Sequence, residues 1–308
     1  MTLTLATFNV KDLLEPQDDG ERQVLGAKLA WIAGMVRACD ADVIGLQEVG
    51  TVELVRAVLE RLDGHAYGEP VMGTADARGI RCALLSRVPV VEARVHTAES
   101  LPFPVFREGD PAPFGTRIPL RRGVVHARVQ APGLGLVDVL VVHFKSSRSV
   151  PARDESGREL PATNARMRSE ATIRSLVWRA AEALYVRRLV DDVLAPDPGG
   201  RVAVVGDLND VPGSPAVRAV RGEGDGELFD CAAGVDARAR SKSVSSSAVV
   251  ATCTTWWPAR VSAAETAPTG PGAPGEPPSA GTTKSGGATT TAWRIGREAY
   301  PKRVTSGA

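Results

Sequence analysis

The chain has 308 residues, a formal net charge of +1 and four cysteines. This length suits one large α/β domain or two small ones, and the near-neutral charge argues against a protein that binds nucleic acid through bulk positive charge. The cysteines are widely spaced and form no C-x-x-C pair, so we expect neither a zinc site nor a disulfide framework.

The first sixty residues alternate between strand and helix patterns. Residues 3–8 alternate polar and apolar side chains, and residues 42–48 form a second, mostly apolar run that ends in polar residues. Residues 21–39 and 51–63 instead place apolar side chains at helical spacing. The order strand, helix, strand, helix predicts an α/β fold.

The middle of the chain is rich in apolar runs separated by turn residues. We expect a first strand pair that turns near Arg87 and a second that turns at Pro132 and Gly133. Such hairpins make the sheet mixed rather than purely parallel. The runs that form these pairs are 81–86 with 88–95, and 123–129 with 136–142. A long helix over 163–193 follows, and Ser214-Pro215 predicts the start of a short helix.

A polar cluster follows the apolar run 202–205. The sequence there is G-D-L-N-D over 206–210, and the glycine predicts a sharp turn at the end of the strand. Open α/β sheets place their chemistry at this end of a strand. Asp207 and Asn209 could therefore bind a phosphate, a water or a hard cation. The same residues also suit an Asx turn without any chemical role, and both interpretations stay open.

Three other predicted strands end in polar residues of the same kind. Asn9, Glu48 and His143 each follow an apolar strand. Taken alone, each is more often a turn residue, the start of a solvated loop or a structural histidine. Because all three follow their strands in the same chain direction as Asp207, a shared site is the better hypothesis.

Five stretches now point to a family. In sequence order they are A-T-F-N-V (6–10), D-V-I-G-L-Q-E-V (42–49), G-I-R-C-A-L-L-S-R-V-P-V (79–90), V-V-H-F-K-S (141–146) and V-V-G-D-L-N-D (204–210). With them the chain resembles the endonuclease/exonuclease/phosphatase superfamily, the DNase I-like metal-dependent phosphohydrolases. The resemblance covers about residues 1–235. It implies a four-layer sandwich, with two mixed β-sheets face to face, helices outside and the site at one edge.

The resemblance also implies residue roles. Glu48 resembles the main ligand of a catalytic Mg²⁺ or Mn²⁺, with Asn9 and Asp207 beside it. Asp207 and Asn209 resemble the pair that orients the attacking water and the phosphate. His143 resembles the histidine that donates to a phosphate oxygen.

Basic residues near these motifs allow two interpretations. Arg81 resembles a residue that faces the phosphate, and the alternative is a surface arginine on a strand. Arg117, Arg121, Arg122 and the segment 145–148 could line a substrate groove or could be solvated loop charges. The expected substrate is a phosphoester, either nucleic acid or a small phosphodiester or monoester.

The family pattern fails after residue 235. It expects a further aspartate and a final S-D-H motif, but no histidine follows His143 and no aspartate follows Asp236. Ser, Thr, Ala, Gly and Pro dominate this part, a composition that buries too little apolar surface to offset the entropy of ordering. We therefore expect a C-terminally incomplete domain over 1–235, without its last core strands, and a disordered low-complexity tail over 236–308.

Two explanations of this C-terminal part stay open. One is a shifted reading frame near residues 235–242, and the other is true divergence. In either case the chain is predicted to be an impaired divalent-metal-dependent phosphoester hydrolase, or alternatively a pseudoenzyme that binds metal or a phospho-ligand.

No nucleophile elbow, P-loop or dinucleotide-binding motif supports another enzyme class. The chain also has no secretory signal pattern and no apolar run near the roughly 20 residues of a membrane span. We expect a cytoplasmic monomer without a membrane span.

Overall fold

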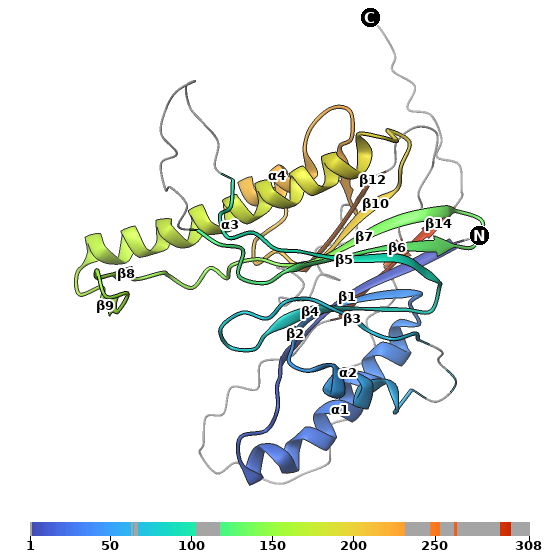
Figure 1. The fold of residues 1–308 in the computed structure, drawn as a ribbon, viewed down its shortest axis with the longest axis horizontal. Coiled ribbons are helices and arrows are strands. Elements are labelled where there is room, and N and C mark those ends of the chain that lie inside the picture. The colour runs from blue at the N-terminus through green and yellow to red at the C-terminus, as the bar shows by residue number, and fades with distance from the viewer. Residues whose placement is uncertain are drawn as a thin grey trace, which may run out of the picture.

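The computed structural model describes residues 2–62, 64, 67–102, 118–231, 247–252, 262–263 and 290–296. Two mixed six-stranded sheets lie face to face, and helices cover both outer faces (Figure 1). This arrangement confirms the predicted four-layer sandwich. No helix in the described part is long and apolar enough to cross a membrane.

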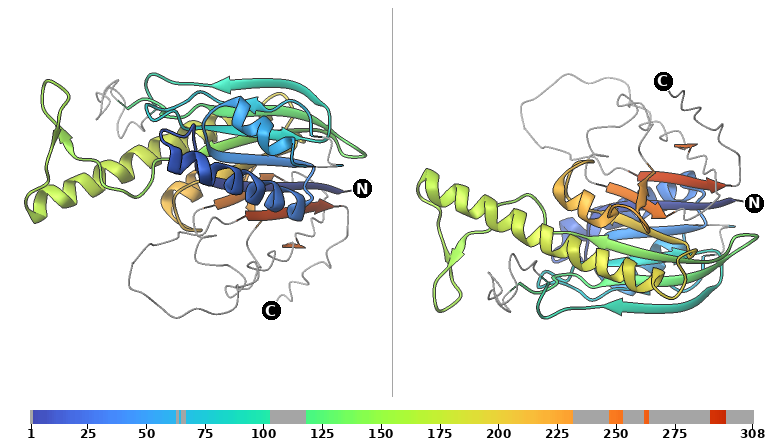
Figure 2. Two further views of the ribbon diagram at one scale, coloured as in Figure 1. Left: turned by 90° about the horizontal axis from the view of Figure 1, so that it is seen from below. Right: turned by 90° about the horizontal axis from the view of Figure 1, so that it is seen from above.

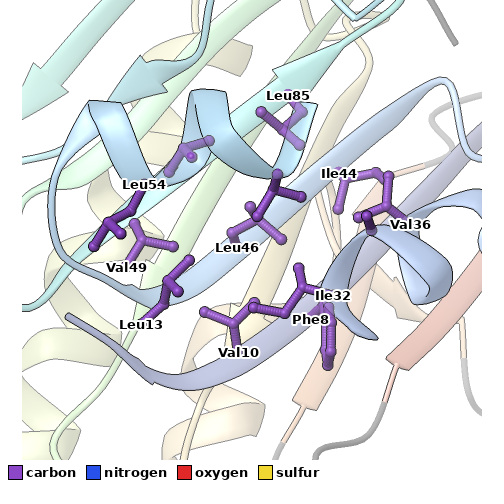
Figure 3. Packing of buried hydrophobic residues seen from close by; sticks show 14 of the residues in the cluster. Phe8, Val10, Leu13, Ile32, Val36, Ile44, Leu46, Val49, Leu54 and Leu85 are labelled. Carbon is purple, nitrogen blue, oxygen red and sulfur yellow. The ribbon is translucent and has the colours of Figure 1, made fainter. Parts of the chain in front are cut away.

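The first sheet contains the N-terminal strand at its centre. Its order is β13 (Ser262–Ala263), β14 (Thr290–Gly296), β1 (Thr2–Leu13), β2 (Val43–Val49), β4 (Arg81–Ser86) and β3 (Val71–Met72). β1 and β2 are parallel, and α1 (Asp19–Cys39) connects them. With α2 (Val52–Leu59), this helix packs over the outer face, where Phe8, Ile32, Val36 and Leu46 are among the buried residues (Figure 3).

The second sheet carries the motif that ends in Asp207. Its order is β11 (Leu228–Asp230), β12 (Ser247–Thr252), β10 (Val202–Asp207), β7 (Gly135–His143), β6 (Val124–Ala131) and β5 (Val90–His96). α3 (Ala165–Leu194) and α4 (Pro215–Arg221) cover its outer face. The first half of α3 projects from the body beside the small pair β8 (Ala152–Arg153) and β9 (Glu159–Leu160) (Figure 2).

The inner faces of the two sheets form the central core. Residues of β1, β2 and β4 pack there against residues of β6, β7 and β10. A Cβ atom on Gly45 of β2 would lie 2.9 Å from Val205 and 3.0 Å from Val141, both on the opposite sheet. Glycine at this position therefore sets how closely the sheets approach.

The predicted helices are confirmed, and their first residues explain where they begin. Asp18, Thr51, Asn164 and Ser214 are the N-caps, and each side chain accepts a hydrogen bond from a backbone N–H in the first turn. Pro215 then occupies the first turn of α4, where its missing N–H has no cost.

One predicted hairpin is confirmed and the other is wrong. β6 and β7 form the antiparallel pair predicted from 123–142. The stretch 81–95 does not fold back on itself, because β4 pairs with β2 whereas β5 pairs with β6. The short connection between them passes from one sheet to the other: Arg87 N donates to Asp42 O on one side, and Pro89 O accepts from Gln130 N on the other.

The C-terminal part also differs from expectation, because it contributes core strands. β12 pairs with β10 and β11, and β14 pairs with β1. Strand pairing uses main-chain hydrogen bonds and β-branched residues, so the runs S-A-V-V-A-T and T-T-A-W-R-I-G suffice without leucine. The remainder of the predicted tail lies outside the described residues, so its predicted disorder stays a prediction.

Candidate active site

Polar side chains from four strands meet at one edge of the sandwich. Asn9 and Glu48 belong to the parallel pair β1 and β2, whereas His143 and Asp207 are register partners at the ends of β7 and β10. The Asn9 Nδ2 atom donates to Glu48 Oε1 and to Asp207 Oδ2, each at 3.0 Å. One amide thus joins the carboxylates of the two sheets. The shared location predicted from sequence is found, whereas the roles of these residues remain to be tested.

The Asx turn predicted for the D-x-N sequence is present in the structure, and the chemical role of these two residues stays a prediction. Asp207 Oδ1 accepts the backbone N–H of Asn209 at 2.9 Å, which is the Asx turn. Its other oxygen, Oδ2, faces Asn9. Asn209 Nδ2 in turn donates to the Phe144 carbonyl at 3.0 Å. The turn is therefore the device that holds Asp207 and Asn209 in the cluster.

The backbone is left-handed at two of these residues. Glu48 has φ of 64° and Asn209 has φ of 51°, a conformation that costs a residue such as glutamate about 1–2 kcal/mol but that asparagine adopts readily. Glu48 Oε2 also accepts the backbone N–H of Asp12 at 3.0 Å. Local strain of this kind persists where surrounding contacts hold it, which occurs most often at functional sites.

His143 completes the cluster from the second sheet. Its Nε2 atom lies 3.8 Å from Glu48 Oε1 and 3.9 Å from Asp207 Oδ2. Burial holds the pKa of His143 well below its usual value, and the positive charges of Arg122 and Arg78 lower the pKa further. The imidazole is therefore neutral near pH 7.

The carboxylate oxygens of Glu48 and Asp207 suit a hard divalent cation, whereas Asn9 presents its Nδ2 to them and its Oδ1 accepts the backbone N–H of Lys11 at 2.9 Å. The carboxylates of Glu48 and Asp207 converge on the same His143 nitrogen, with the Asn9 amide between them. Within the described ranges, no three His, Cys, Asp or Glu side chains are gathered closely enough to enclose a metal ion. Few protein ligands, all of them oxygen, are typical for Mg²⁺, which keeps several of its waters.

The structure tests the predictions for some of the basic residues near the site and leaves others open. Arg81 lies at the start of β4, opposite Val49, and no hydrogen bond or ion pair joins its side chain to the cluster within the described residues. Its contact with phosphate stays a prediction. A solvated-loop interpretation is wrong for Arg122 and Lys145, which are only 6% and 5% exposed. Arg121 is exposed and lies 4.8 Å over the Trp178 ring, whereas Arg117 lies outside the described residues.

Sequence reasoning missed a buried acid behind the site. Glu182 of α3 is 1% exposed, and its Oε2 accepts the backbone N–H of Lys145 at 2.5 Å. Burial raises the pKa of Glu182 to about 7, although this hydrogen bond and nearby positive charges oppose the rise. The only sequence signal was a glutamate on the buried face of a long helix.

We predict that Glu182→Gln stabilises the protein at alkaline pH. The folded state binds the Glu182 proton more tightly than the unfolded state, so the stability of the natural chain falls as pH rises from 4.5 to about 7. Glutamine removes this loss, and the gain at pH 8.5 relative to pH 5.5 should be on the order of 2 kcal/mol. Urea unfolding at the two pH values measures it. The exposed substitution Glu155→Gln is the control, and equal pH dependence in all three proteins would contradict the prediction.

Comparisons with known proteins agree with this fold. The sequence model of the Endonuclease/Exonuclease/phosphatase family matches residues 6–295. TDP2 from Caenorhabditis elegans has a similar structure, with a TM-score of 0.57, 16% identity and coverage of 96% of this chain and 74% of TDP2. An endonuclease/exonuclease/phosphatase family protein from Bacteroides thetaiotaomicron has a TM-score of 0.57 and 14% identity, over 96% of this chain and 98% of its own.

A mannosyl-6-phosphatase from Bacteroides thetaiotaomicron is also similar, with a TM-score of 0.55, 15% identity and coverage of 96% of this chain and 98% of its own. At these identities the structural similarity shows the fold. No match was found among curated proteins. The family match extends from β1 to β14 and includes every residue of the cluster. The protein therefore belongs to the endonuclease/exonuclease/phosphatase family, whose members hydrolyse phosphoester bonds.

Proposed function

We propose that the chain is a phosphoester hydrolase that depends on Mg²⁺ or Mn²⁺. The single observation that carries this proposal is the Asn9 amide, which binds Glu48 of one sheet and Asp207 of the other at 3.0 Å each. This contact brings two carboxylates together at an edge where a phosphoester could enter. Glu48, Asn9 and Asp207 would hold the cation.

The cation would neutralise charge on the phosphoryl oxygens. The protein's own side chains position the attacking water and the phosphate. The Asp207 carboxylate orients a water and accepts its proton, and Asn209 orients the phosphate from the same turn. His143, which is neutral, offers an N–H to a phosphoryl oxygen.

Turnover by this chain is proposed to be low. The family resemblance calls for a second aspartate and a terminal histidine as acid and base, but neither motif is present after residue 236. β12 and β14 keep the sheets complete at these positions without supplying those side chains.

The alternative is a pseudoenzyme that binds the metal or a phospho-ligand without turnover. Reading the gene in all three frames over codons 220–308 would show whether the missing motifs lie in another frame.

The substrate and the setting of the protein are proposals as well. Residues 1–230 carry 28 Lys/Arg against 32 Asp/Glu, so no bulk positive charge favours duplex DNA over a small phosphoester. We propose a cytoplasmic monomer that acts on one of these two substrate classes. Assays with DNA, an inositol phosphate, sphingomyelin and simple phosphodiesters would separate them.

We predict slow, metal-dependent hydrolysis of bis(p-nitrophenyl) phosphate. Release of nitrophenol should stop in EDTA and return with excess Mg²⁺ or Mn²⁺, because the two carboxylates need a cation to bind the phosphate anion. Hydrolysis that is insensitive to EDTA would contradict the proposal. Binding of Mn²⁺ in calorimetry without any turnover would favour the pseudoenzyme.

A further inference from the structure

The Arg122 side chain is a buried cation that the proposed chemistry does not use. It lies just before β6, is 6% exposed and forms no ion pair with a carboxylate in the described part of the chain. A buried charge without a carboxylate partner is costly, so its hydrogen bonds must explain its place. Those bonds lead directly to the active-site cluster.

Arg122 makes two directed contacts with consecutive residues at the end of β7. Its Nη1 lies 2.8 Å from His143 Nδ1, and its Nη2 donates to the Phe144 carbonyl at 3.3 Å. The same carbonyl accepts the Asn209 amide at 3.0 Å. Arg122 is thus joined to both His143 and Asn209, although its own charge does not touch the place where the carboxylates converge.

The Arg122 contact determines where the His143 proton lies. A guanidinium has only donors, so His143 Nδ1 must be the acceptor in this bond. A neutral imidazole with an unprotonated Nδ1 carries its proton on Nε2. That nitrogen is the one that faces Glu48 and Asp207, at 3.8 and 3.9 Å, which is beyond hydrogen-bond distance of either carboxylate.

We propose that Arg122 is a positioning residue, which fixes His143 with its N–H on Nε2 and holds that N–H away from both carboxylates. The ring then presents a donor, and never a lone pair, to a phosphoryl oxygen placed between Glu48 and Asp207. Without Arg122, the ring is free to turn and to close on one of the carboxylates. The expected effect on turnover rests on the proposed function. The assignment of the His143 proton to Nε2 does not depend on that function.

The test reads the ring nitrogens directly. In the full chain labelled with ¹⁵N-histidine, two-bond proton–nitrogen correlations distinguish protonated from unprotonated ring nitrogens. His143→Gln identifies the signals of His143 among the four histidines. We expect a protonated Nε2 and an unprotonated Nδ1. A protonated Nδ1 in the natural chain would overturn the proposal even if no variant folds.

The variants test the cause. Arg122→Lys keeps the charge but loses the planar fork that reaches two acceptors, and Arg122→Gln keeps a donor but loses the charge. In both, the Nδ1 resonance of His143 should move, and kcat should fall roughly 10-fold while KM changes little. Arg128→Lys is the matched control, because Arg128 lies on β6 and binds Asp138 instead.

The outcomes separate this inference from the proposed function. An Nδ1 resonance that stays in place in both Arg122 variants overturns the positioning role, whatever happens to kcat. A resonance that moves while kcat stays unchanged supports the positioning role and counts against His143 as a phosphate donor. A rise in KM alone, with the Nδ1 resonance unchanged, also overturns the positioning role, because an arginine with a merely structural role would have that effect.

Discussion

Asp207→Asn is expected to lower metal-dependent phosphodiester hydrolysis by about 100-fold or more. The substitution removes a negative charge from the place where Glu48 and Asp207 converge. It also puts an amide nitrogen where Oδ2 now accepts from Asn9 Nδ2, or else where Oδ1 accepts from Asn209 N. In either orientation two donors face each other, so one of the contacts that assemble the site is lost.

The measurement compares initial rates at saturating Mn²⁺, together with Mn²⁺ affinity from calorimetry. Asp225→Asn is the matched control, because it makes the same change at an exposed position away from the cluster. Both the rate and the metal affinity should fall in Asp207→Asn, while the control stays near the natural chain. An Asp207→Asn protein with undiminished hydrolysis would rule out Asp207 as a ligand or base.

The fold and the main site residues could be predicted because their signals are local. Each of Asn9, Glu48, His143 and Asp207 follows a short apolar run in the sequence, although β1 continues past Asn9 to Leu13 and β2 past Glu48 to Val49. A parallel pair places such residues at one edge of its own sheet, and the family resemblance carried by the five motifs implied that the two sheets face each other with the site at one edge. The contacts of Asn9 with both carboxylates then agree with the predicted location.

The rest depended on long-range contacts that no local pattern records. The stretch 81–95 reads as a hairpin, but β4 and β5 enter different sheets because their partners lie far away in the chain. The sequence left Arg122 open between a substrate groove and a solvated loop and gave Glu182 no role, yet tertiary contacts with the end of β7 bury both side chains. β12 and β14 were missed because a leucine-poor segment can still complete a sheet through main-chain pairing.

Gly206→Ala should cause the largest loss of stability of any single methyl addition near the site. Sequence reasoning assigned this glycine to a sharp turn, but β10 continues through Asp207, and the left-handed residue of the turn is Asn209. Gly206 has φ of 149°, and a Cβ there would lie 2.0 Å from the Val142 carbonyl oxygen and 2.9 Å from its carbon. Glycine is needed for this close approach of two backbones.

The clash cannot be relieved by a side-chain rotation, because the obstacle is the main chain of β7. That strand is paired on both sides, with β10 and β6, so any shift breaks hydrogen bonds of the sheet. We expect a loss of about 3–5 kcal/mol, measured by urea unfolding. Gly213→Ala is the control, since its φ of 85° is also unfavourable but no atom lies within 4 Å of its Cβ position.

The control should cost only about 1–2 kcal/mol, the cost of the backbone conformation. Equal losses in the two variants would show that the strands separate easily and that Gly206 is not fixed by packing. In Gly206→Ala, the shift of β10 away from β7 would also move Asp207 away from Asn9, because Asp207 is the register partner of His143 on β7. A folded Gly206→Ala protein should therefore also lose Mn²⁺ affinity, because the strand that carries the ligand is the strand that the methyl group displaces.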